Sequence, residues 1–375
     1  MTLRMELVLP KLERVVRQQR ERLEELRAAL GGARRALAKW AEDPSAGDAV
    51  IEGAMAGSSQ PYALSFEPRL DEARPAPPPA PATVVATDGS SIVPDRFLPI
   101  PCFVVNIGRV ALPYGVDGEP LLDSYPVVGP SEEAGVGHEG LGGRTIGLLR
   151  DVLELEAAAE LAAARARHGP VVVLLDGTLI PWDLDSVEVE PRVREVLRER
   201  TKSALERLRS LGEHLSLGAY VSASQSSDVA NSLRALGAHA GELWSDGALF
   251  AGMLAPGDRT ALFRARSERT RRAEEYFPEH EVCFFYVRVD DDVARVELPR
   301  WAAAEGSLER LHAALISQAE HCGGYPRALQ EAHEQAVITA RERELFARIL
   351  ESESGQLGMR VLLAGKRRSK RRRAV

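Results

Sequence analysis

Apolar residues at helical spacing mark both ends of the chain. Within residues 6–43 they predict a long amphipathic helix, interrupted near Gly31 and Gly32, with Pro10 tolerated in its first turn. The positions that carry this pattern are Leu12, Val15, Val16, Leu23, Leu26 and Leu30. Residues 325–363 are predicted to be helical as well. The apolar stripe of the first helix has to be buried, which favours a homodimer.

Between these ends, β-branched apolar runs alternate with helix-forming segments. The predicted strands are residues 83–93, 102–112, 171–175 and 215–224, and the predicted helices are residues 145–167, 190–211 and 227–237. The first two strands are expected to pair as a hairpin or meander. A second hairpin is predicted within residues 281–299, where alternating residues flank an acidic turn. This order predicts an α/β fold with a mixed sheet flanked by helices.

A proline-rich segment suggests how the chain is divided. The stretch ARPAPPPAPA, residues 73–82, can form neither a helix nor a central strand, because proline fixes φ and lacks an amide donor. We expect an N-terminal helical arm (1–72), this linker (73–82), a main domain (83–350), and a helix end with a basic tail (351–375).

Composition narrows the class of protein. The 375 residues carry a net charge of −7, which taken alone argues against binding of nucleic acid, yet the segment KRRSKRRR at 366–373 concentrates basic residues. No apolar run of about 18 residues occurs, and the N-terminus becomes charged before a signal-peptide core can form, so we expect a cytoplasmic protein. Three widely spaced cysteines exclude a disulfide framework and a Cys-based zinc site.

The most informative local signal is a pair of Asp-Gly motifs. Asp88-Gly89-Ser90 and Asp176-Gly177-Thr178 each follow an apolar strand. In an open α/β sheet the strand ends surround the active crevice, and carboxylates fixed there suit Mg²⁺ or Mn²⁺. The alternative is an ordinary turn, since Asp-Gly is a common turn dipeptide.

Two helical segments add further candidates. The helix before the second motif carries Glu154, Glu156 and Glu160, and its apolar neighbours leave no clean polar stripe, so at least one Glu is expected to face inward. An inward carboxylate needs a partner, and a metal ion is one. His333, in YPRALQEAHEQAVIT, is either a metal ligand or an ordinary helix histidine.

Several segments occur in the order seen in NurA-domain nucleases, which the chain resembles over roughly residues 80–350. They are TDGSSIVPDRFLPIPCFVVNIGRV, VVLLDGTLIPWD, GAYVS, LWSDGALFAGMLAPGDRTALF, CFFYVRV with ARVELPRW, and GYPRALQEAHEQAVIT. The resemblance implies an RNase H-like core. It also implies a Mn²⁺-dependent deoxyribonuclease, with Mg²⁺ as the alternative and two ions in the site. Such an enzyme cuts single-stranded DNA and degrades DNA ends in the 5′–3′ direction.

The resemblance also implies partners and site residues. The partners are single- and double-stranded DNA and a hexameric HerA-type ATPase that acts in the resection of double-strand breaks, and the assembly is a homodimer. The metal aspartates fall on Asp88 and Asp176, and the glutamate falls on Glu156, with Glu154 as its nearest rival. The C-terminal ligand falls on His333. A site tyrosine corresponds to Tyr220, with Tyr286 as the alternative.

Contacts to DNA and other classes of function complete the expectations. Basic residues near the proposed site in sequence are Arg96, Arg109, Arg144 and Arg150. The basic tail is either a phosphate-binding segment or a solvated terminus. The alternatives to a nuclease are a non-catalytic NurA-like partner of a ring ATPase and, more weakly supported, an actin-like ATPase.

Overall fold

The chain forms two compact units. The computed structural model describes residues 5–93, 102–130, 143–186, 188–238, 245–320 and 322–356. One unit consists of Met1–Pro77 and Tyr220–Ala303, and the other of Pro78–Ala219 and Ala304–Val375. The break between Pro77 and Pro78 falls in the proline-rich segment. However, residues 220–303 group with the N-terminal segment rather than with the predicted main domain.

The first unit contains an antiparallel sheet with strand order β1-β7-β8-β9 and the helices around it. The strands are β1 (Tyr62–Ser65), β7 (Phe263–Arg266), β8 (Val282–Val289) and β9 (Asp292–Pro299). The helices are α1 (Met5–Glu42), α2 (Pro44–Met55), α5 (Asp228–Ala235), α6 (Asp246–Ala251) and α7 (Glu268–Tyr276), with short 3-10 turns at Pro278–His280 and Arg300–Ala302. The hairpin predicted within 281–299 is present, with Asp290 at φ 50° in its turn.

The predicted interruption of the first helix is wrong. Helix α1 runs without a break through Gly31 and Gly32, and Pro10 lies inside it. A glycine costs a helix only about 1 kcal/mol relative to alanine, and the alanines, arginines and leucines around this pair are strong helix formers. Three positions of the predicted apolar stripe, Leu12, Val15 and Val16, are exposed on the N-terminal part of α1.

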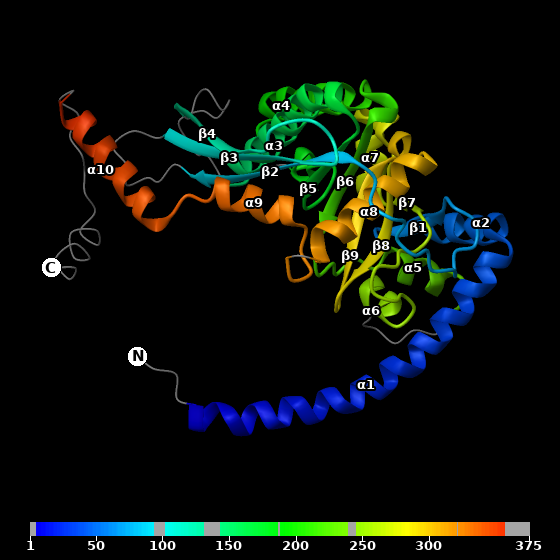
Figure 1. Ribbon diagram of the computed structural model, residues 1–375. Coiled ribbons are helices and arrows are strands. Elements are labelled where there is room, and N and C mark those ends of the chain that lie inside the picture. The colour runs from blue at the N-terminus through cyan, green and yellow to red at the C-terminus, as the bar shows by residue number, and fades with distance from the viewer. Residues whose placement is uncertain are drawn as a thin grey trace. The chain divides into compact units, whose positions relative to one another are not determined.

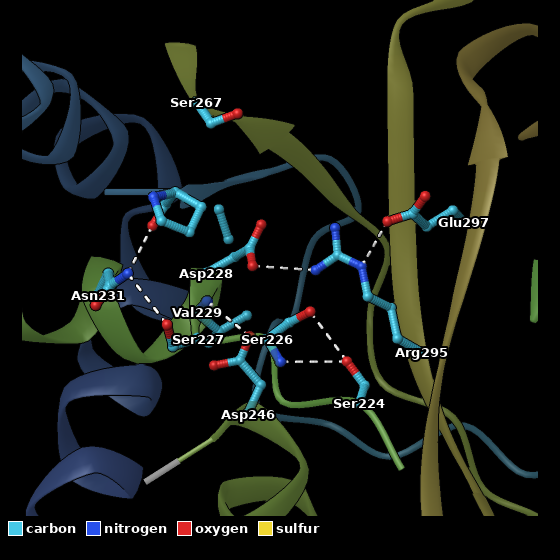
Figure 2. Close-up of polar contacts among 12 residues, drawn as sticks. Ser224, Ser226, Ser227, Asp228, Val229, Asn231, Asp246, Ser267, Arg295 and Glu297 are labelled. Atoms are coloured by element: carbon cyan, nitrogen blue, oxygen red, sulfur yellow. Dashed lines mark hydrogen bonds and ion pairs between the residues drawn. The ribbon is translucent and has the colours of Figure 1, made fainter. Parts of the chain in front are cut away.

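The interior of the first unit is organised by a buried network of charges (Figure 2). The Arg295 guanidinium lies 3.2 Å from the Asp228 carboxylate and 2.8 Å from the Glu297 carboxylate. Asp246 accepts hydrogen bonds from two backbone amides of α5 and from the Tyr286 hydroxyl at 2.8 Å. Burial, reinforced by the charge of Asp228, raises the pKa of Asp246 to about 7. Each of these groups contacts another member of the network, so it joins α5 and α6 to the sheet.

The second unit is a mixed sheet flanked by helices, which confirms the predicted α/β class (Figure 1). Its strand order is β6-β5-β2-β3-β4, with β3 antiparallel to both β2 and β4, and β5 parallel to β2. The strands are β2 (Ala82–Ile92), β3 (Cys102–Tyr114), β4 (Leu121–Pro130), β5 (Val171–Asp176) and β6 (Leu215–Val221). The helices are α3 (Gly143–Arg165), α4 (Pro191–Arg209), α8 (Glu305–Glu320), α9 (Arg327–Ala336) and α10 (Ala340–Gln356). Short 3-10 turns lie at Ala166–His168, Trp182–Asp185 and Gly212–His214.

Strand β2 confirms the strand predicted over residues 83–93, because β3 pairs with it along its whole length, so Asp88 lies within the strand rather than after it. One expectation for this unit needs correction. The C-terminal helix is not continuous, since α9 ends at Ala336 and α10 begins at Ala340. Across the described part of the chain, every helix is too short or too polar to cross a membrane.

Helices α3 and α9 cover opposite faces of the β2–β3 pair. Side chains alternate along a strand, and the register pairs Asp88 with Gly108 on one face. The Asp88 carboxylate contacts His333 of α9, whereas the Thr87 hydroxyl, one position earlier, donates to the Glu154 carbonyl of α3. Figure 1 shows α9 on one side of β2 and β3, with α3 and α4 on the other.

Gly108 allows α9 to lie directly on β3. A Cβ atom at this position would collide with the Ala332 carbonyl oxygen and lie 2.7 Å from the Ala336 amide nitrogen. Both are backbone atoms of a helix and cannot move aside individually. Asn106, on the same face, fixes the end of α9 by donating to the Gln335 and Ala336 carbonyls at 3.2 and 3.0 Å.

Substitution of Gly108 by alanine should therefore destabilise the second unit. We expect the free energy of unfolding to fall by about 1–3 kcal/mol, the usual cost of overpacking a tight contact. Urea denaturation measures this change. Gly306→Ala in α8 is the control, since a Cβ there meets no atom within 4 Å. Equal stability of the two variants would contradict the proposed fit between α9 and β3.

Candidate active site

The register between two parallel strands brings the Asp-Gly motifs together. Strand β2 pairs with β5 from Thr83–Val171 to Thr87–Leu175, so the next residues, Asp88 and Asp176, are neighbours where β5 ends. Beyond this point β2 continues without β5 beside it. Gly177, at φ 89°, lets the chain turn away from the strand. The site therefore lies at the carboxyl end of β5.

Helix α3 reaches the same place from the opposite face of the sheet. Its Glu154 side chain is only 14% exposed. Gly89 makes this approach possible, because a Cβ there would lie 2.5 Å from Glu154 Oε1 and 2.6 Å from Arg150 Cγ. In this motif the glycine thus makes room for a side chain of α3.

Helix α9 contributes His333 to the face that carries Asp88. Its Nδ1 lies 2.7 Å from Asp88 Oδ2, and its side chain is 67% exposed. When Nδ1 carries the proton and donates to the carboxylate, Nε2 keeps its lone pair and could accept a proton or bind a cation. The contact between α9 and Gly108 thus positions the His333 imidazole beside Asp88.

These side chains line one pocket of about 700 Å³. Its charged and titratable lining residues are Asp88, Arg150, Asp151, Glu154, Asp176, His333 and Arg343. Burial raises the pKa of Glu154 well above its usual range, and the charges of Asp151, Asp88 and Asp176 add to this rise. Burial also raises the pKa of Asp176, and the negative charge of Asp88 raises it further. The hydrogen bond from Tyr325 lowers this pKa, but by less than the rise. The acidic side chains of this lining, Asp88, Asp151, Glu154 and Asp176, outnumber its two arginines, Arg150 and Arg343.

The donors in this pocket fit a divalent cation by their chemistry. Carboxylate oxygens and an imidazole nitrogen are ligands that Mn²⁺ and Mg²⁺ accept. Glu154 Oε1 is buried without a well-aligned hydrogen bond from the described residues, although Arg150 Nε lies 3.1 Å away. Across the described ranges, no three Asp, Glu, His or Cys side chains are close enough together to hold one ion as they stand. The chemical types of the side chains thus suit a divalent cation, but the side chains would have to move closer together to bind one.

Two of the residues expected in the site lie elsewhere. Glu156 lies two positions from Glu154, on another side of α3, and Arg200 of α4 binds its carboxylate at 2.7 and 2.8 Å. Tyr220 is fully buried and does not line the pocket.

The tyrosine that reaches the site was missed by the sequence reasoning. Tyr286, the alternative to Tyr220, is fully buried and hydrogen-bonds to Asp246 in the first unit. The hydroxyl of Tyr325, by contrast, hydrogen-bonds to Asp176. Its signal was the Tyr-Pro that precedes α9.

The basic residues proposed from the sequence also differ in their location and in their partners. Arg109 is paired with Asp123, and Arg144 with Asp183 and Glu188, while Arg96 and the basic tail lie outside the described residues. Arg150 lies within the pocket. The residue that sequence reasoning missed is Arg343 of α10. It donates to the Ser91 carbonyl at 2.7 Å and forms no ion pair with a described carboxylate.

Comparison with known proteins now gives the class of the chain. Residues 82–338 match the NurA domain. The match begins where β2 begins and includes Asp88, Glu154, Asp176 and His333. The chain belongs to the NurA family, a family of nucleases.

Other comparisons add little. No curated protein matches the chain. Among solved structures, it is similar to the prototype foamy virus protease-reverse transcriptase, at 17% identity and a TM-score of 0.24, over 41% of this chain and 19% of that chain. It is also similar to LC9-RNase H1, a type 1 RNase H with the type 2 active-site motif, at 11% identity and a TM-score of 0.22, over 42% of this chain and 72% of that chain. Both TM-scores are too low to support an argument about mechanism.

The environment of Glu154 predicts a pH-dependent difference between two variants. Because the folded-state pKa of Glu154 is raised, its contribution to stability is complete below the unfolded value of 4.5 and is lost as the pH rises through the folded value. Glu154→Gln cannot ionise, so its stability relative to wild type should increase as the pH rises. Urea unfolding with a chelator present, between about pH 5 and 8, measures this difference.

Glu156→Gln is the matched control for this experiment. Its partner Arg200 is partly exposed, so this substitution should cost at most about 1 kcal/mol. If the free energy of unfolding depends on pH in the same way for Glu154→Gln and for wild type, the pKa of Glu154 is not raised in the folded protein.

Proposed function

We propose that this protein is a metal-dependent deoxyribonuclease, and that the pocket in its second unit is the site where phosphodiester bonds are hydrolysed. The observation that carries the proposal is the pocket in which Asp88, Glu154 and Asp176 meet at the end of β5. Membership of a nuclease family supports hydrolysis of a nucleic acid. We infer single-strand endonuclease and 5′–3′ exonuclease activity from the resemblance to NurA nucleases.

The carboxylates of Asp88, Asp176 and Glu154 would hold the Mn²⁺ or Mg²⁺ ions. When bound, such ions make water nucleophilic and neutralise charge on the scissile phosphate. Tyr325 fixes the Asp176 carboxylate by a hydrogen bond. His333, oriented by Asp88, is placed to bind an ion or to accept a proton from the attacking water through Nε2.

A nucleic-acid chain would approach along the side of the pocket that carries Arg343. Its guanidinium donates to the Ser91 carbonyl and the Ser90 hydroxyl of β2, and no carboxylate of the described residues neutralises its charge, which supports a contact with phosphate. The basic tail at 366–373 would add contacts that do not depend on base sequence.

The assembly is also part of the proposal. A HerA-type hexameric ATPase as partner, a homodimer and a role in the resection of DNA double-strand breaks rest on the resemblance to the family. The exposed apolar residues of α1, among them Leu9, Leu12 and Val16, support an association through that helix.

One observation favours a second candidate, a non-catalytic NurA-like partner of a ring ATPase. The described residues contain no ready-made group of three metal ligands, and Glu156 is bound to Arg200. A scaffold of this kind would bind its ATPase and leave DNA intact.

Removal of either aspartate separates the two candidates. Asp88→Ala and Asp176→Ala should each lower Mn²⁺-dependent degradation of single-stranded DNA by more than the roughly 10–100-fold that loss of an outer-shell partner costs. Glu154→Gln should show a similar loss, and Glu156→Gln should not. The assay uses 5′- and 3′-labelled DNA with Mn²⁺, Mg²⁺ or a chelator. Wild-type protein that leaves DNA intact with either ion would support the scaffold.

Arg343 provides a separate test of DNA binding. Arg343→Gln should weaken binding of single-stranded DNA and reduce the salt dependence by about 0.7, the slope contributed by one phosphate contact. Fluorescence anisotropy with a chelator measures binding without cleavage. Arg348→Gln is the control on the same helix, because Arg348 is paired with Glu344 and lies outside the pocket lining. Unchanged affinity and slope in Arg343→Gln would remove this residue from the DNA path.

A further inference from the structure

Arg150 lines the acidic pocket. It precedes Glu154 by one turn of α3, and its Nε lies 3.1 Å from Glu154 Oε1. A terminal nitrogen of the same guanidinium lies 2.8 Å from Asp151 Oδ1. The stem of the side chain lies over Gly89, where a Cβ atom would come within 2.6 Å of Arg150 Cγ. The arginine is thus held in the pocket at both its stem and its head.

The positive charge of Arg150 partly balances the negative charges of Asp151 and Glu154. Of the two arginines that line the pocket, Arg343 is bound to the Ser91 carbonyl, so Arg150 is the one paired with the acids. A guanidinium is effectively always protonated in a protein, and the Glu154 and Asp151 carboxylates lie beside this one. Arg150 therefore stays charged.

The same carboxylate atom is needed by a metal ion. Glu154 Oε1 is the oxygen nearest to Arg150 Nε, yet the geometry is too poor for a hydrogen bond. An ion bound by Glu154 would put a second positive charge beside the guanidinium, and like charges a few ångströms apart repel one another. Arg150 and the ion thus cannot both stay where Glu154 holds them.

We propose that Arg150 is a positioning residue that acts as an internal counter-ion: it holds Glu154 and Asp151 while the pocket contains no divalent cation, and it must leave Glu154 before one binds. This inference rests on the proposed function only in that the pocket binds such an ion.

Binding of Mn²⁺ alone, without DNA, tests the inference. The electron paramagnetic resonance signal of free Mn²⁺ gives the dissociation constant for the full-length protein. Arg150→Gln removes the competing charge and should bind Mn²⁺ more tightly than wild type, by about tenfold or more, a factor that corresponds to about 1.4 kcal/mol. Arg200→Gln is the matched control, since it also breaks an Arg–Glu pair of α3 but at Glu156, and it should bind as wild type does.

Methylguanidinium distinguishes competition from a general effect of charge. In Arg150→Ala the vacated space should admit this small cation, and millimolar concentrations should weaken Mn²⁺ binding in a saturable way towards the wild-type value. Wild type and Arg200→Ala should show no such saturable effect. If Arg150→Gln does not fold, Arg150→Lys replaces it: its ammonium can pair with only one carboxylate, so Mn²⁺ binding should still tighten, but by less.

The possible results are separable. Mn²⁺ binding that is lost in Asp88→Asn but is unchanged or weakened in Arg150→Gln would overturn the inference and leave the proposed function standing. Saturable competition by methylguanidinium in wild type would also overturn it. Failure of every variant, including wild type, to bind Mn²⁺ would overturn the inference together with metal dependence.

Discussion

Repulsion among carboxylates at the end of β5 is the constraint on which the second unit depends. Asp88, Glu154 and Asp176 come from two strands and a helix, and burial together with their mutual charge raises the pKa of Glu154 and Asp176. Such a group of acids persists only if the backbone holds it. The β2–β5 register, the close approach of α3 at Gly89 and the contact of α9 with Gly108 supply this rigidity.

Much of the fold was predictable from local patterns. The run VVVLL, the hairpin around Asp290 and the helix before β5 are long or regular enough for periodicity to identify them. Residues 220–303 pack with the N-terminal segment, a grouping that local patterns do not reveal because it depends on contacts distant in sequence. The continuous α1 was missed because glycine weakens a helix without ending it.

The site was predictable only in part, for a geometrical reason. Asp88 and Asp176 were recognisable because Asp-Gly follows an apolar run in both places, and the structure puts them side by side. Spacing alone could not choose between Glu154 and Glu156, which point about 200° apart around a helix. That choice depends on which side of α3 meets Gly89. Tyr325 and Arg343 reach the pocket through tertiary contacts that no local pattern encodes.

Charge also imposes an order on the proposed reaction. A pocket lined by Asp88, Asp151, Glu154 and Asp176 repels a phosphodiester until cations neutralise it, and Arg150 is already engaged with two of these acids. In the proposed reaction, metal ions would therefore have to enter before DNA could bind productively. If Glu154 held such an ion, the Arg150 guanidinium would be free to bind phosphate, as the Arg343 guanidinium on the same pocket lining is proposed to do. The net charge of −7 thus says little about affinity for nucleic acid, because four of the acids that contribute to it line a pocket in which bound cations would offset them.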